Sequence, residues 1–209
     1  RRPLSLPKAP AAAHNARPSK TSTSKIFSGV LLFSLSGIVG GLFAVILALS
    51  GSLGAALWIG VLTGIATILG YVLYLMGLGE LQGILQGEDA SAIGKVKLAT
   101  ILLIIGACVS VLFSIVPLLG TIVGSIISGI LNIVGCILCV MAFAQLKKST
   151  TFPATALSGV SKLYVAYLLN LIGYGLMLTV ILAVVAPILN LVAFIMILIG
   201  WAGVKNAQV

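Results

Sequence analysis

Residues 98–146 read LATILLIIGACVSVLFSIVPLLGTIVGSIISGILNIVGCILCVMAFAQL and contain no Asp, Glu, Lys, Arg or His. A helix needs about 20 apolar residues to cross a bilayer, so this stretch is too long for one span and long enough for two. Charge-free stretches also occupy residues 26–79 and 163–204. The sequence therefore predicts an all-α, polytopic membrane protein with six transmembrane helices, arranged as three helical hairpins.

The overall composition favours the same class. The chain is 60% hydrophobic and 7% charged, whereas a soluble domain is about half apolar and about one quarter charged. The bases outside the first 25 residues flank the charge-free stretches, and basic residues near span ends stay on the cytoplasmic side. We therefore expect both termini on the inner side of a bacterial inner membrane or an organellar membrane. The net charge of +9 indicates orientation in the membrane rather than binding to nucleic acid.

The first 25 residues form a separate segment that is rich in proline and basic residues and has no acid. This composition cannot bury a core, so we expect a disordered basic tail at 1–25 and a six-helix transmembrane domain at 26–209. The tail fits three roles: a solvated segment that lies on anionic lipid, a remnant of a targeting peptide, or a partner-binding arm. Because the chain begins with arginine, we expect residues upstream of it.

We place the spans, and the connection between the first two hairpins, from the positions of the charged residues. The connection covers residues 80–97 and holds Glu80, Glu88 and Asp89, which we expect to be solvated and to pair with Lys95 and Lys97. The outer turns hold Pro117 and Pro187. The predicted spans are 26–49, 54–79, 98–116, 121–144, 163–185 and 188–204.

The second span of each hairpin repeats a common pattern. The segments read GIATILGYVLYLMGLGEL from Gly64, GILNIVGCILCVMAFAQL from Gly129 and PILNLVAFIMILIGWAGV from Pro187. Every hairpin enters and leaves on the same side, so the repeats are parallel and related by an axis along the membrane normal. This pattern predicts a pseudo-threefold bundle of hairpins.

Thr67, Asn132 and Asn190 are the most informative polar residues in the spans. They occupy equivalent places in the repeat and lie about 22 Å from the inner face at 1.5 Å per residue. They could form a polar ring around the bundle axis, or each could make a hydrogen bond between helices that fixes packing. Asn170 has the same two interpretations at a shallower depth.

The spans hold no ionisable residue for a proton relay or for activating a nucleophile, so we predict that the protein is not an enzyme and binds no cofactor or metal. Cys136 and Cys139 form a C-x-x-C pair, and Cys108 lies at a similar depth. A dithiol or soft-metal site is conceivable. A thiolate is disfavoured in apolar surroundings, however, so we interpret the three cysteines as small packing residues.

Small residues spaced by four let helix backbones approach closely, either within the bundle or against a partner helix. Such pairs recur along the predicted spans, and the candidate packing or partner faces are Gly37 and Gly41, Gly60 and Gly64, and Gly120 and Gly124. Aromatic residues near predicted span ends favour interfacial anchoring. These residues are Trp58, Trp201, Tyr164 and Tyr167.

Two functions remain. The sequence favours a non-catalytic accessory, scaffold or assembly subunit of a larger membrane complex, whose partners are membrane lipid and other membrane subunits or further copies of the chain. The other possibility is a small channel or carrier for a neutral or apolar solute, which the repeats and the polar residues at one depth would support.

Overall fold

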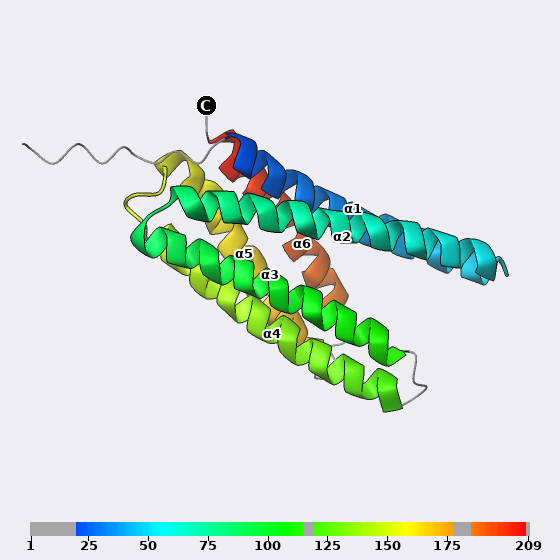
Figure 1. Cartoon of the computed structure of the whole chain (residues 1–209). Coiled ribbons are helices and arrows are strands. Elements are labelled where there is room, and N and C mark those ends of the chain that lie inside the picture. Colours follow the sequence, from blue (N-terminus) through cyan, green and yellow to red (C-terminus); the bar gives the residue numbers. More distant parts are fainter. Residues whose placement is uncertain (1–19, 115–118, 178–184, 208–209) are drawn as a thin grey trace, which may run out of the picture.

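A computed structural model describes residues 20–114, 119–177 and 185–207 (Figure 1). Within these ranges the chain is helical, without strands. Six of the described helices are long and apolar enough to cross a membrane, which confirms the predicted all-α class and the number of candidate spans. They are α1 (Lys20–Leu49), α2 (Leu53–Ile84), α3 (Gly87–Ser114), α4 (Leu119–Lys147), α5 (Leu157–Met177) and α6 (Val185–Asn206), with a 3₁₀ helix, η1 (Ala154–Ala156), before α5.

The helices extend beyond the charge-free stretches at the end of the bundle that holds Lys25, Glu80, Asp89, Lys147 and Lys205, which we call the charged end. The connection predicted over residues 80–97 is wrong in extent, because only Leu85 and Gln86 separate α2 from α3. Glu88 and Asp89 lie in the first turn of α3, where carboxylates stabilise the positive end of the helix dipole. Similarly, α1 begins at Lys20, inside the segment predicted as a tail. Residues 1–19 of that tail lie outside the described residues.

The six described helices form a closed ring. Each helix packs against the next one in the chain, most extensively within the pairs α1–α2, α3–α4 and α5–α6, and α6 packs back against α1. The start of α1 and the end of α6 share one end of the ring, where the Lys205 ammonium lies 4.9 Å from the centre of the Phe27 ring. Figure 1 shows that the first two hairpins meet at the α2–α3 loop and diverge toward their own turns.

The large buried side chains gather near the charged end of the ring. Trp201 is edge-on to Tyr74 at 5.9 Å and to Phe143 at 6.0 Å, and Phe143 stacks on Tyr167 at 5.5 Å between ring centres. Trp201 and Tyr167 are buried, so the prediction that they anchor the protein at the membrane interface is wrong. They fill the space between α2, α4, α5 and α6 instead.

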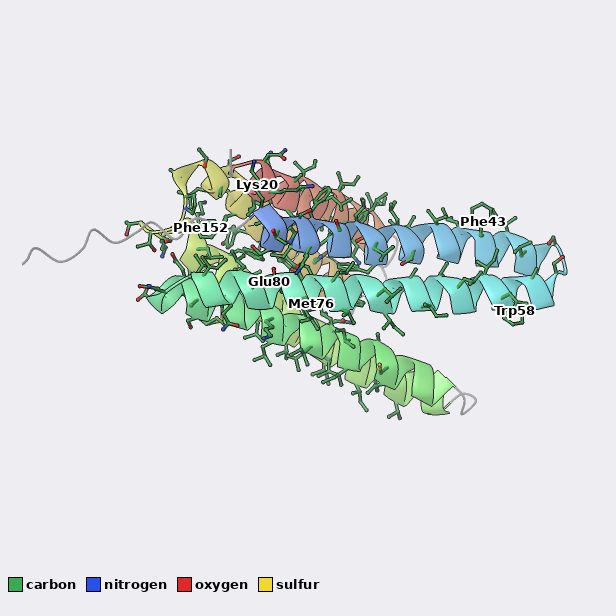
Figure 2. All side chains as sticks on the ribbon, turned by 45° about the horizontal axis from the view of Figure 1, so that its top comes forward. Lys20, Phe43, Trp58, Met76, Glu80 and Phe152 are labelled. Atoms are coloured by element: carbon green, nitrogen blue, oxygen red, sulfur yellow. The ribbon has the colours of Figure 1, made fainter. Side chains whose placement is uncertain are left out.

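The opposite end of the first hairpin presents apolar side chains outward. Leu49 is 83% exposed and Trp58 is 71% exposed, and Figure 2 shows Phe43 and Trp58 far along the hairpin from Lys20 and Glu80. In a membrane, lipid tails cover such surfaces without cost, since they are as apolar as the side chains.

Glycines bring paired helices into backbone contact. A Cβ added at Gly70 would lie 2.5 Å from the Phe33 nitrogen, and one added at Gly29 would lie 2.6 Å from the Gly70 oxygen. In the third hairpin, a Cβ at Gly159 would lie 2.5 Å from the Gly200 oxygen. Only glycine fits at these crossings, and none of the four belongs to the glycine pairs that the sequence analysis selected.

The glycines selected from the sequence have other surroundings. A Cβ at Gly64 would meet no atom within 4 Å, so this glycine lies on open surface, and Gly124 is buried. The remaining four are helical, but their surroundings lie outside what the structure describes; they are Gly37, Gly41, Gly60 and Gly120.

Candidate functional site

A cavity of about 500 Å³ lies inside the ring, next to the buried aromatic cluster. This volume is within the range of about 300–1,000 Å³ that is typical of small-molecule sites. Every described membrane helix contributes to its lining: α1 provides Ser34, α2 Tyr71, α3 Thr100, α4 Asn132, α5 Asn170 and α6 Phe194. The site therefore depends on closure of the whole ring and not on any one hairpin.

Aromatic rings form much of the cavity wall. Phe33 of α1 and Tyr71 of α2 stack with 4.6 Å between ring centres and 8° between ring planes. Tyr74 stands edge-on to Phe33 at 5.9 Å. Tyr174 from α5 and Phe194 from α6 also line the cavity. These rings offer flat apolar contacts, and the tyrosines add hydroxyl groups that can donate or accept hydrogen bonds.

The polar lining residues are uncharged, and several keep hydrogen-bonding capacity. The Ser34 hydroxyl is buried and has no partner among the described residues. The Asn132 amide nitrogen has one long contact, 3.5 Å to the Ser128 hydroxyl. Thr100, in contrast, donates to the Val96 carbonyl at 2.9 Å. A buried hydroxyl without a partner costs about 1–3 kcal/mol, so Ser34 favours a polar group in the cavity.

Thr67, Asn132 and Asn190 do not line one common space, as the predicted polar ring would require. Asn132 lines the cavity, whereas the Thr67 hydroxyl lies 2.8 Å from the Ser36 hydroxyl and donates to the Thr63 carbonyl at 2.8 Å. Thr67 thus joins α1 to α2. Asn190 is outside the cavity lining, and its amide oxygen is buried without a partner in the described part of the chain.

The three cysteines are free thiols in different surroundings. Cys136 lines the cavity, Cys139 is buried in the core beside it, and Cys108 is exposed on α3. Among the described residues, no group of three or more His, Cys, Asp and Glu side chains could hold a metal ion.

Two acidic residues, Glu80 and Asp89, connect neighbouring parts of the chain at the charged end of the ring. Glu80 of α2 forms an ion pair with Lys25 of α1. Asp89, only 4% exposed, accepts hydrogen bonds from the hydroxyls of Ser149, at 2.7 Å, and Thr151. These carboxylates therefore connect neighbouring helices and loops. The prediction that the acids pair with Lys95 and Lys97 is therefore wrong for Glu80 and Asp89, which have these other partners instead.

Lys95 has a different polar partner. Its ammonium donates to the Gln145 side chain at 2.8 Å, and the Gln145 amide nitrogen donates to the Glu88 carbonyl at 2.9 Å. Gln145 therefore ties α4 to the start of α3 at the charged end of the ring.

Sequence reasoning found Asn132 and Asn170 but missed Ser34 and most of the aromatic wall. One pattern could have found the wall, because a tyrosine inside a span needs a hydrogen-bonding partner for its hydroxyl. Tyr71 and Tyr74 are spaced by three and Tyr167 and Tyr174 by seven, so each pair shares a helix face. Those two faces point into the same cavity.

Comparisons of the chain with protein-family models, with curated proteins and with solved structures found no match.

Proposed function

We propose that this chain is a non-catalytic membrane protein that binds a neutral solute in its six-helix cavity and carries it within or across the bilayer. The observation that supports this proposal is the cavity itself, because all six described membrane helices contribute uncharged polar or aromatic groups to one space. Such a lining suits an uncharged molecule, since burying an unpaired charge there would be costly.

The proposal includes the parallel repeat of hairpins. It is supported by positions that are equivalent in the register of the second spans and share an environment in the ring. One set lines the cavity and consists of Tyr71, Cys136 and Phe194. Another fills the buried core and consists of Leu78, Phe143 and Trp201. A pseudo-threefold bundle would bring three equivalent helix faces toward a central site of this kind.

The proposed orientation has the charged end, with both chain termini, on the inner side of a bacterial inner membrane or an organellar membrane. It is supported by the clustering of Lys25, Lys95, Lys147 and Lys205 near that end of the helices, because basic residues near span ends are retained on the cytoplasmic side. In this orientation the cavity lies deeper in the membrane than the charged end, within the hydrocarbon region.

The test compares the small molecules that the protein retains when it is extracted from its own membrane in mild detergent. We expect a neutral molecule in the wild type that Asn132→Leu loses and Asn190→Leu keeps, since only the first substitution changes the cavity lining. Ala107→Phe, which fills the cavity without removing a polar group, should lose it too. The proposal fails if wild type and Asn132→Leu retain the same molecules in the same amounts.

A second candidate function is an accessory or assembly subunit. It is favoured by an apolar groove along the outer part of the first hairpin, where Leu35, Val39 and Phe43 of α1 face Ile59 of α2. The occupant would be an apolar helix of another membrane subunit. Native-mass measurement of the extracted particle tests this role, because a stoichiometric second polypeptide would support it and a lone chain or homo-oligomer would contradict it.

A further inference from the structure

We infer that the solute is a flat, uncharged ring molecule with oxygen substituents, of the quinone or phenol class, that reaches the cavity from the bilayer. This inference rests on the proposed function and names the chemical class of its ligand. Three features of the cavity carry it: the shape of the aromatic wall, the unused hydrogen-bonding groups, and the absence of charge from the lining residues.

The aromatic wall favours a planar ligand. The Phe33 and Tyr71 rings are stacked within 8° of parallel and both line the cavity, so α1 and α2 together contribute an aromatic wall. Aromatic pairs gain stabilisation beyond the burial of their area when the rings are offset-stacked or edge-to-face. A ligand ring between this wall and Tyr174 or Phe194 would gain such contacts, whereas a flexible aliphatic chain would gain burial alone.

The unused polar groups favour oxygen substituents on that ring. Ser34 has a buried hydroxyl without a partner, and Asn132 makes only a 3.5 Å side-chain contact. A hydroxyl and an amide nitrogen can both donate to a carbonyl or phenolic oxygen. A ligand with such oxygens would satisfy the Ser34 hydroxyl, which a pure hydrocarbon cannot do.

The surroundings of the cavity favour an uncharged, lipid-soluble molecule. The lining residues include no Lys, Arg, His, Asp or Glu, so a charged ligand would be buried without a counterion. The helices that form the cavity expose apolar side chains on their outer faces, such as Ile68 on α2 and Ile105 on α3. The protein is therefore surrounded by lipid, which dissolves neutral rings and excludes ionised ones.

Trp201 provides a direct binding test. It contacts Tyr74 of the cavity wall with 5.9 Å between ring centres, and the only other tryptophan, Trp58, lies on the exposed outer end of α2. In a Trp58→Phe background, Trp201 fluorescence reports on the cavity. We expect duroquinone, a neutral ring with two carbonyl oxygens, to quench it saturably, while a sulfonated anthraquinone does not.

Matched variants locate the binding. Ser34→Ala and Asn132→Leu should each weaken duroquinone binding by about tenfold, equivalent to about 1.4 kcal/mol, and Asn190→Leu should leave it unchanged. Ser34→Ala is a small change that keeps the test decisive if Asn132→Leu disturbs folding. Decanol, which has a hydroxyl but no ring, should fail to displace duroquinone.

The outcomes separate this inference from the proposed function. The inference that the solute is a ring molecule is overturned if quenching rises linearly with duroquinone concentration or is the same in all three variants. Displacement of duroquinone by decanol at equal concentration also overturns it. If the extracted protein then still retains a neutral, ring-free molecule that Asn132→Leu loses, the proposed function survives without this inference. If it retains no neutral molecule and duroquinone does not saturate, both fail.

Discussion

Replacing Gly70 with alanine is expected to force α1 and α2 apart. An alanine Cβ at this position would lie 2.5 Å from the Phe33 nitrogen, whereas ordinary van der Waals contact begins at 3.4 Å, so the backbones must separate by about 0.9 Å (3.4 − 2.5). The Gly29 oxygen is also only 2.9 Å away. The Phe33 Cβ is equally close, and because none of these three atoms moves when a side chain rotates, no side-chain rotation relieves the clash. Overpacking of this kind costs about 1–3 kcal/mol.

The matched control is Gly64→Ala, on the same helix and with the same chemical change. A Cβ there meets no atom within 4 Å, and alanine is the better helix former. The assay heats each detergent-purified variant and measures the fraction that stays monodisperse. We expect a lower midpoint temperature for Gly70→Ala than for the wild type and no loss for Gly64→Ala. Equal midpoints for the two variants would refute the assigned α1–α2 crossing.

Two predictions concern the charged end of the ring. Asp89→Ala should destabilise the protein by about 1–3 kcal/mol, because it removes the buried carboxylate that accepts hydrogen bonds from the Ser149 and Thr151 hydroxyls. Glu88→Ala, a change at its exposed neighbour, should have little effect, and the same heating assay would contradict the assignment if the two variants behaved alike. The side chains of the Lys25–Glu80 ion pair are 32% and 37% exposed. A double-mutant cycle should therefore give a coupling energy of at most about 1 kcal/mol, and this energy should decline with added salt. A larger or salt-independent coupling energy would show that the pair is less hydrated than its exposure indicates.

The helices were predictable because each span has to satisfy the bilayer by itself. Residues 98–146 are too long for one span and too apolar for a water-exposed loop, and α3 and α4 occupy this region. The helix ends at the charged side were harder to predict. Charge marks where a span leaves the hydrocarbon, not where its hydrogen bonds stop, so α2 continues past Glu80 to Ile84.

The candidate site was predictable only in part. Asn132 stood out as a polar residue in an apolar span, and it lines the cavity. Thr67 and Asn190 stood out for the same reason, yet neither is part of the lining. Depth in the membrane follows from counting residues along a helix, whereas the direction in which a side chain points depends on the rotation of the helix about its axis.

The class of the protein and its candidate spans follow from the residue pattern alone, because a span must satisfy the hydrogen bonds of its own backbone in lipid whatever its neighbours do. How the helices pack against one another places Trp201 and Tyr167 in the core, forms the helix crossing at Gly29 and Gly70, and encloses one cavity among the six described helices. These spans are apolar on all faces, so no polar stripe fixes their rotation. Their rotation is set by close packing between small residues and by hydrogen bonds between helices, which exist only once the ring has assembled.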